Sequence, residues 1–444
     1  MIPVVFDMDR VLADVHWLVE EIGPRRPRSG AEKAAVDGVI QRLEAAGWTP
    51  IPGVESPVAC RGKGGRLFLA HVDSVPGSPG AIDNAGSVAV LLELARTTNA
   101  SDLCLGFPVQ EEAGLIGSRD LAYMWDDLGV GPLELVVAAE FIGDGTPTAM
   151  DLWDVWGHEE LRWLMDNTDI DIPFRHHLVG RTMPVWRSDH AYFADHGVLS
   201  FNLINRSEHN VHIRYHQPSD DTVKPEALKA SFEVFEQMAT APPIKRGEGD
   251  PAVRIGPWLL PGSVTWLTIG MGLLSGIPGL PTWRASVADF IRTCVTALLA
   301  GAAMWLLTHI GFPVHEAEQT AHHALDVPIS GWWAAAPWAV GLGWLIWVGM
   351  WKVLPGKGHP ALASAMLCLV ALMAGPLFAF PFALGALAVR IHPLFGIAPV
   401  VLWLQPSVLR EITFHGLAAP WMWSLLFLAT WPAFGRRKSN GMPS

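Results

Sequence analysis

Three polar residues in one short segment could bind a metal ion. His71, Asp73 and Asp83 follow the apolar run Leu67–Ala70 and precede a predicted helix that begins near Ser87. Loops that leave the carboxyl ends of parallel strands meet in a common cleft, so their side chains can share an ion. Imidazole and carboxylate groups together suit zinc, and Asp73 could accept the ring proton of His71. The competing interpretation is that these are solvated turn residues.

A pair of adjacent carboxylates is the second candidate. Glu111 and Glu112 follow another apolar run, Leu103–Val109. One carboxylate of such a pair can coordinate a metal while its neighbour takes a proton from metal-bound water. The competing interpretation is an ordinary acidic helix start, where carboxylates interact favourably with the helix dipole.

The third candidate, Glu140, stands directly at the end of the very apolar run Leu133–Ala139. A carboxylate at the end of a buried strand needs a metal ion or a cation as its partner. Asp144, four residues later in the same predicted turn, is an alternative ligand from this part of the chain.

The fourth candidate is His216, in the sequence YHQPSDDT. His209 and His212 lie close by, and any of these three histidines could be exposed or simply hydrogen-bonded. Taken together, the four candidates include the two histidines and three carboxylates that make up the ligand set of a site with two metal ions.

The candidates need strands to position them. Short apolar runs that alternate with helical or loop segments predict an α/β domain with a mostly parallel or mixed sheet sandwiched by helices. The predicted strands are Leu67–Ala70, Leu103–Val109, Leu133–Ala139 and Leu199–Ile204. The predicted helices cover Val11–Gly23, Ala31–Ala46 and a segment from Ser87 to Arg96.

The motifs in this order resemble those of metallopeptidase family twenty-eight, the co-catalytic zinc enzymes that include bacterial leucyl aminopeptidases and aminopeptidase Y. The resemblance spans residues 1–240 and rests on GPRRPRSGAE, HVDSVPGSPGAIDNAGSVAVLLELAR, EEAGLIGS, SDHAYFADHG and YHQPSDDT. It implies a zinc exopeptidase-like fold with two zinc ions per chain. An apolar second half makes the chain similar to the endoplasmic-reticulum and vacuolar membrane metallopeptidases of that family.

The resemblance also implies a role for each candidate. His71 and Glu140 would bind one zinc ion, and Glu112 and His216 would bind the other. Asp83 would bridge both ions.

The remaining two candidates would not be ligands. Glu111 would be the general base, and Asp73 would orient His71.

The chain departs from the family pattern at several positions. Gln110 stands where Gly commonly precedes the glutamate pair, and Ala85, Gly86 and Ser87 reverse the usual order of small residues. Glu140 replaces the Asp of soluble members, as in the membrane-bound branch, which favours it over Asp144. The segment SDH at 188–190 matches a family motif, and no metal role is assigned to it.

The second half of the chain has a different composition. Long apolar runs with few charges predict an all-α multi-pass transmembrane domain of about six spans at residues 257–435. The zinc peptidase domain would cover residues 1–240. Residues 241–256, which are rich in Pro and Gly, would form a linker, and residues 436–444 would form a basic tail.

Charge distribution indicates partners and localisation. The acidic excess lies before residue 255, which disfavours a nucleic-acid partner. The resemblance implies a peptide substrate, and the apolar second half predicts a lipid bilayer as a partner. The loop Gly311–Gly331 lacks Lys and Arg, whereas Lys352 and Lys357 flank the next loop. This pattern predicts an integral membrane protein with its peptidase domain on the extracytoplasmic face, although the basic tail favours the opposite orientation.

The predicted function is hydrolysis of N-terminal peptide bonds by a zinc-dependent aminopeptidase. One alternative is a single-zinc enzyme similar to glutaminyl cyclases, which a count of zinc per chain would distinguish. The other is a non-catalytic membrane receptor or scaffold on a peptidase fold, against which the complete ligand set argues.

Overall fold

The computed structural model describes residues 5–150, 152, 156–172, 188–206, 214, 216–247, 252–255 and 258–275, together with scattered residues between 277 and 387. The chain divides into two compact units, residues 1–176 with 184–249 and residues 177–183 with 250–444. All seven candidate residues lie in the first unit. The domain boundaries expected from composition remain predictions.

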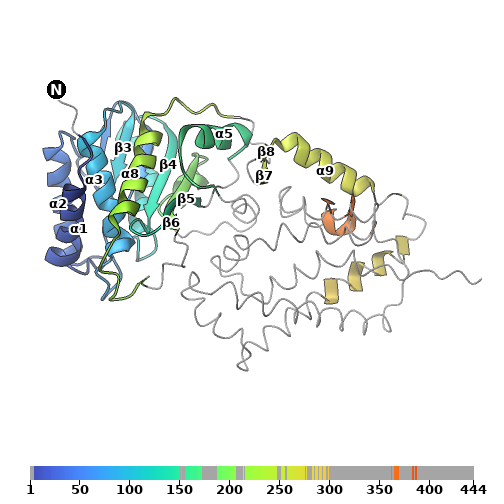
Figure 1. Ribbon diagram of the computed structural model, residues 1–444, viewed down its shortest axis with the longest axis horizontal. Helices are drawn as coiled ribbons and strands as arrows, with labels where there is room; N and C mark the ends of the chain where they lie inside the picture. The colour runs from blue at the N-terminus through green and yellow to red at the C-terminus, as the bar shows by residue number, and fades with distance from the viewer. Residues whose placement is uncertain are drawn as a thin grey trace, which may run out of the picture. The chain divides into compact units, whose positions relative to one another are not determined.

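A six-stranded mixed sheet forms the centre of the first unit, with the strand order β1-β3-β2-β4-β6-β5 (Figure 1). The pairs β2–β3, β2–β4 and β4–β6 are parallel, whereas β1 and β5 pair antiparallel at the two edges. The strands are β1 Val58–Arg61, β2 Gly65–Leu69, β3 Leu103–Gly106, β4 Leu133–Glu140, β5 Thr146–Met150 and β6 Ser200–Arg206.

The sequence pattern located the four inner strands and omitted the two edge strands. The predicted α/β fold with a mixed sheet and covering helices is therefore confirmed for this unit. β5 contains Pro147, which lacks a backbone N–H and is tolerated at a sheet edge. Neither edge strand shows the continuous apolar run by which the buried parallel strands were recognised.

Helices pack on both faces of the sheet. Their bounds are α1 Met8–His16, η1 Trp17–Ile22, α2 Gly30–Ala45, η2 Ala81–Ala85, α3 Gly86–Thr97, α4 Ile116–Met124, η3 Trp125–Leu128, α5 His158–Asn167, α7 Ala191–Asp195 and α8 Pro225–Thr240. The helices predicted from apolar spacing correspond to α1 with η1, to α2 and to α3.

Alternation along β2 shows how the layers meet. Successive side chains of a strand point to opposite faces. Leu67 and Leu69 share an apolar cluster with Trp125 and Phe193 of the η3 and α7 side, whereas the ring of Phe68 lies 5.0 Å from that of Phe235 in α8. The sheet is therefore covered by α4, η3 and α7 on one face and by α8 with α3 on the other. Figure 1 shows α3 and α8 over the same face of the sheet.

The second unit contains a short hairpin, β7 Val253–Ile255 and β8 Trp258–Leu260, and the helix α9 Gly262–Leu274. Among the described residues, no helix is both long enough and apolar enough to cross a membrane. α9 lies within residues 257–435, which composition predicted to be transmembrane. It has 13 residues and is about 20 Å long, whereas a bilayer core is about 30 Å thick.

This finding overturns the predicted localisation as a multi-pass integral membrane protein with an extracytoplasmic peptidase domain, and with it the argument for a bilayer partner. The prediction rested on the hydropathy of the side chains and took no account of helix length. The sequence SGIPGLP follows α9 directly. Its prolines and glycines disfavour a continuous helix. Most residues of the later predicted spans, and the whole basic tail, lie outside the described residues.

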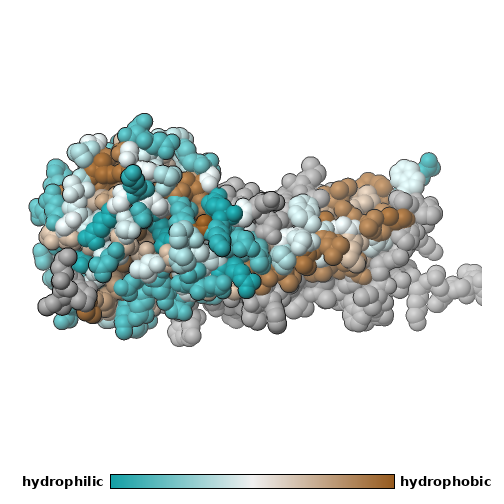
Figure 2. All heavy atoms as spheres, turned by 90° about the horizontal axis from the view of Figure 1, so that it is seen from above, coloured by the Kyte–Doolittle hydropathy of each residue, from teal (hydrophilic) through white to brown (hydrophobic). Residues whose placement is uncertain are grey.

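The described part of the second unit exposes apolar side chains. Trp266, Leu267, Met271 and Leu274 of α9 are each about half exposed or more. Figure 2 shows apolar side chains gathered there, whereas hydrophilic side chains cover much of the visible face of the first unit.

Candidate metal centre

Neighbouring strands deliver the first ligand candidates to one edge of the sheet. His71 follows the end of β2, and Glu140 is the last residue of β4, which pairs with β2 in parallel. Glu111 and Glu112 follow β3, which pairs with β2 on its other side. Since the carboxyl ends of parallel strands meet at one edge, residues far apart in sequence converge there.

One group of side chains surrounds the imidazole of His71. Its Nε2 lies 3.2 Å from Oδ1 of Asp83, 3.3 Å from Oε2 of Glu140 and 3.9 Å from Oε2 of Glu111. His71, Glu111 and Glu140 offer ligand atoms that lie within 4.8 Å of one another.

A second group surrounds the imidazole of His216. Its Nε2 lies 3.0 Å from Oε2 of Glu112 and 3.4 Å from Oδ2 of Asp83. Asp83 therefore faces His71 with one carboxylate oxygen and His216 with the other. This placement is what a carboxylate shared by two ions requires.

The spacing of these atoms fits zinc. Ligand atoms about 2.0–2.1 Å from a tetrahedral ion are separated from each other by about 3.3 Å. The separations between Asp83 and the two imidazoles, and between His71 and Glu140, are close to that value. In addition, Oε1 of Glu112 is buried and makes no hydrogen bond within the described part of the chain. Two imidazoles and several carboxylates form a donor set that suits a borderline divalent ion.

The charges of the cluster act on the two histidines. Burial alone would lower the pKa of His71, but the charges of Glu140 and Glu111 outweigh it and hold that pKa well above its usual value. Burial also opposes protonation of His216, whose hydrogen bonds with Asp83 and Glu112 raise its pKa to about 9.

The carboxylates respond in opposite directions. Burial disfavours ionisation of Asp83, yet hydrogen bonds from both imidazoles hold its pKa well below the usual value. Burial, followed by the charge of Asp83, raises the pKa of Glu112 to about 7. For Glu111, burial is the largest cause and holds the pKa well above its usual value, and the charge of Glu140 adds to it.

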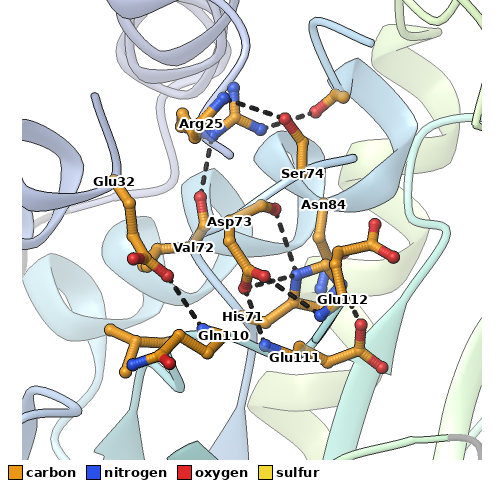
Figure 3. A network of polar contacts seen from close by, with 12 residues as sticks. Arg25, Glu32, His71, Val72, Asp73, Ser74, Asn84, Gln110, Glu111 and Glu112 are labelled. Carbon is orange, nitrogen blue, oxygen red and sulfur yellow. Dashed lines mark hydrogen bonds and ion pairs between the residues drawn. The ribbon is translucent and has the colours of Figure 1, made fainter. Parts of the chain in front are cut away.

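Other polar residues hold the ligands in place. Asp73 accepts hydrogen bonds from the backbone N–H groups of Glu111 and Glu112, and its Oδ1 lies 3.4 Å from Nδ1 of His71. Ser188 donates to Oε1 of Glu140 at 3.1 Å. Figure 3 shows Asp73 between His71 and the glutamate pair.

Asp220 holds the backbone at and before Asp83 in place. Its two carboxylate oxygens accept the backbone N–H groups of Ile82 and Asp83, at 2.9 and 3.1 Å, and its backbone carbonyl accepts that of Ala81. The turn that carries His216 therefore also fixes the backbone of Asp83.

Arg25 is a fully buried cation next to this centre (Figure 3). Its guanidinium donates to the backbone carbonyls of Val72, Pro79 and Gly80, which belong to the loop between His71 and Asp83, and to those of Leu18 and Gly23. Burial lowers its pKa to about 10, and nearby carboxylates oppose that shift.

The structure brings all seven sequence candidates together. It also separates the alternatives, because the carboxylate of Asp144 lies 2.7 Å from Nζ of Lys224, outside the two groups. His209 and His212 lie outside the described residues. The predicted roles of the seven residues follow from the resemblance and remain predictions.

Sequence reasoning missed the supporting residues Arg25, Glu32, Ser188 and Asp220. The motifs GPRRPRSGAE, SDHAYFADHG and YHQPSDDT contain all four residues, but a motif does not show which residues its members contact. Their partners lie dozens of residues away in the chain, and apolar spacing does not indicate such pairs.

Comparison with known proteins supports a hydrolytic centre. Residues 61–239 match the sequence model of Peptidase family M28. No curated protein matches the chain.

Several solved structures are similar to the chain. They include a zinc aminopeptidase from Bacillus subtilis (14% identity, 52% of this chain and 94% of that chain, TM-score 0.44). LapA aminopeptidase from Legionella pneumophila is similar at 16% identity over 53% of this chain and 71% of that chain, with TM-score 0.45. Glutaminyl cyclase from Porphyromonas gingivalis shows 18% identity over 53% of this chain and 98% of that chain, with TM-score 0.41.

The family match covers three of the strands that deliver ligands, and it covers every residue of the two groups around His71 and His216. This match confirms the prediction of a metallopeptidase. Residues 61–239 therefore form a metallopeptidase domain that matches peptidase family M28.

Proposed function

We propose that the chain is an aminopeptidase that uses two zinc ions, held by His71 with Glu140, by His216 with Glu112, and by Asp83 between them. The observation that carries the proposal is the placement of Asp83, whose two oxygens lie 3.2 and 3.4 Å from Nε2 of the two histidines. Bound zinc would polarise the substrate carbonyl and lower the pKa of the attacking water.

Glu111 is the proposed general base. Its Oε2 lies 3.9 Å from Nε2 of His71, and its side chain is only 12% exposed. Its neighbour Glu112 faces the other histidine, so Glu111 remains available to move a proton. In the proposed reaction, Oε2 of Glu111 takes the proton of the attacking water and gives it to the departing amine.

Charge supports action at the amino end of a peptide. The four carboxylates of the two groups would balance the charge of two zinc ions, so the loaded centre would carry no net positive charge to hold a substrate's α-carboxylate. A carboxypeptidase would need a cation for the substrate's α-carboxylate. Near the described centre, Arg25 is fully buried and donates to backbone carbonyls, so it does not offer such a contact.

The test uses the purified full chain, its zinc content and matched peptide substrates. We expect two zinc ions per chain and hydrolysis of aminoacyl substrates with a free α-amino group. The same substrates with an acetylated amino group should remain intact, whereas amidation of the carboxyl end should have little effect. Cleavage of acetylated substrates, or no cleavage by the zinc-loaded chain, would refute the aminopeptidase. Cyclisation of an N-terminal Gln with one zinc per chain would favour the cyclase alternative.

A further inference from the structure

Glu32 is a buried carboxylate that joins the N-terminal segment to the turn carrying the proposed base. It lies in the first turn of α2, where its backbone N–H donates to the capping side chain of Ser29. Its Oε2 accepts the backbone N–H of Arg28 at 2.6 Å, and its Oε1 accepts the backbone N–H of Gln110 at 2.8 Å. Figure 3 shows this second contact, made across 78 residues of sequence.

Gln110 has a backbone conformation that non-glycine residues rarely adopt. Its φ is 55°, in the left-handed region, which is strained for a residue with a Cβ atom. The side chain is held as well, because Oε1 accepts from Nε of Arg28 at 2.7 Å and Nε2 donates to Oε1 of Glu55 at 3.0 Å. Three hydrogen bonds therefore stabilise a turn in which Gly would be free of strain.

This turn determines where the glutamate pair points. Glu111 and Glu112 follow Gln110 directly, and they diverge toward His71 and His216 respectively. A change in the φ of Gln110 would rotate the chain that follows and move both carboxylates. Asp73 accepts the backbone N–H groups of Glu111 and Glu112, and Glu32 accepts that of Gln110, the residue before them.

We propose that Glu32 is a positioning residue, which aims Glu111 and Glu112 by holding the backbone N–H of Gln110 in the left-handed turn. This role rests on the proposed peptidase function of the same site. It also explains why the chain has Gln where the family pattern has Gly, since the contacts with Glu32, Arg28 and Glu55 compensate for the strain.

The first test is Glu32→Gln in the full chain, because the amide cannot accept both backbone N–H groups. At saturating zinc we expect kcat for a free aminoacyl substrate to fall at least tenfold, with KM changed less than twofold. Chelator competition should show that one of two zinc ions is bound more weakly, because Glu112 is a proposed ligand. A kcat within twofold of wild type would overturn the proposal.

Glu160 offers a matched control. It is as buried as Glu32, and its carboxylate likewise accepts two backbone N–H groups, those of Gly157 at 3.2 Å and Gly247 at 2.7 Å. Glu160→Gln should lower thermal stability to a similar extent and leave kcat and zinc affinity unchanged. An equal loss of kcat in both variants would show that only general stability is involved, and would overturn the proposal.

A double-mutant cycle with Gln110→Gly separates positioning from packing. In the Gln110→Gly background the turn no longer carries Cβ strain, so adding Glu32→Gln should lower kcat less than twofold. The same loss in both backgrounds would overturn the proposal. If Glu32→Gln does not fold, Glu32→Asp keeps the charge but shortens the side chain, so it should weaken the contact with the backbone N–H of Gln110 and lower kcat at least threefold. An unchanged kcat in that variant would overturn the proposal.

The zinc measurement keeps the two hypotheses distinguishable. If the zinc-loaded wild-type chain hydrolyses none of the substrates, the proposed function fails. Weaker binding of one zinc ion in Glu32→Gln, but not in Glu160→Gln, would still support the positioning of Glu112. Equal zinc affinity in both variants would overturn it.

Discussion

The carboxylate of Asp73 accepts the backbone N–H of Glu112 at 3.0 Å, and through its other oxygen that of Glu111 at 3.1 Å. The same side chain lies 3.4 Å from Nδ1 of His71. Asp73 therefore connects the loop after β2 to the turn after β3, in addition to orienting a histidine.

We predict that Asp73→Asn impairs both functions. The amide retains one acceptor oxygen, so one of the two backbone N–H groups loses its partner, and His71 loses the adjacent negative charge. Carboxylates of this kind typically contribute 10–100-fold to metal affinity or activity. We expect losses of about that size in kcat and in zinc affinity, measured by steady-state kinetics and chelator competition. Asp120→Asn, at an exposed position, is the control and should change neither.

Glu111→Gln separates proton transfer from metal binding. Because Glu112 faces His216 and Glu111 is the more distant neighbour of His71, the variant should retain both zinc ions. Loss of a general base typically costs about 10²–10⁴-fold in rate. The checks are kcat and the zinc content by elemental analysis. Activity near that of wild type would mean that another group moves the proton.

His216→Ala should remove one of the two zinc ions. The variant leaves His71, Asp83 and Glu140 for the first ion but leaves the second with only Asp83 and Glu112. Elemental analysis of the dialysed protein should give one zinc per chain, with kcat lowered at least a hundredfold. Two tightly bound ions in this variant would contradict the assignment of His216 as a ligand.

The sequence predicted that the candidate residues would lie together because each comes after an apolar run, as His71 follows β2 and Glu140 ends β4. Parallel strands place such residues at one edge whatever the details of their packing. The left-handed turn at Gln110 could not be predicted, because it depends on Glu32, 78 residues earlier. The structure also joins Cys60 of β1 to Cys104 of β3 by a disulfide. This pair was not predicted, because β1 was not recognised as a strand.

The membrane prediction failed for a different reason. It relied on composition alone, and an apolar run can cross a bilayer only if it forms a helix long enough to span the hydrocarbon core. α9 ends at Leu274, and the sequence that follows contains Pro278 and Pro281. The apolar composition therefore did not distinguish a membrane-spanning helix from a shorter helix such as α9.

Zinc binding should release protons near neutral pH. The pKa of His216 is about 9 in the metal-free protein, so its imidazole is protonated at pH 7.5 and must lose that proton to bind zinc. Zinc affinity should therefore rise with pH between about 7 and 9, as His216 loses this proton. Calorimetry in buffers of different ionisation enthalpy measures the release at pH 7.5 and 9.5. No dependence on the buffer at pH 7.5 would contradict the prediction.

The disulfide between Cys60 and Cys104 should stabilise the peptidase domain without affecting catalysis. The two residues are opposite each other in the register of β1 and β3 and are 44 positions apart in sequence. Closing a loop of that length lowers the entropy of the unfolded chain by an amount worth about 4 kcal/mol, and native disulfides typically contribute about 2–5 kcal/mol. The edge strand β1 would otherwise be held to the sheet mainly by its pairing with β3.

We expect the Cys60→Ser/Cys104→Ser variant to lose about 2–4 kcal/mol of unfolding free energy. The relevant transition in thermal unfolding of the full chain is the one that shifts upward when zinc is added, since zinc binds only the folded site. A reducing agent should lower this transition in the wild type and have no effect on the double variant. Because β1 lies at the edge of the sheet, separated from β4 and Glu140 by β3 and β2, kcat at 25 °C should stay within twofold of wild type. A wild-type transition that is insensitive to reduction would show that the bond contributes little to stability.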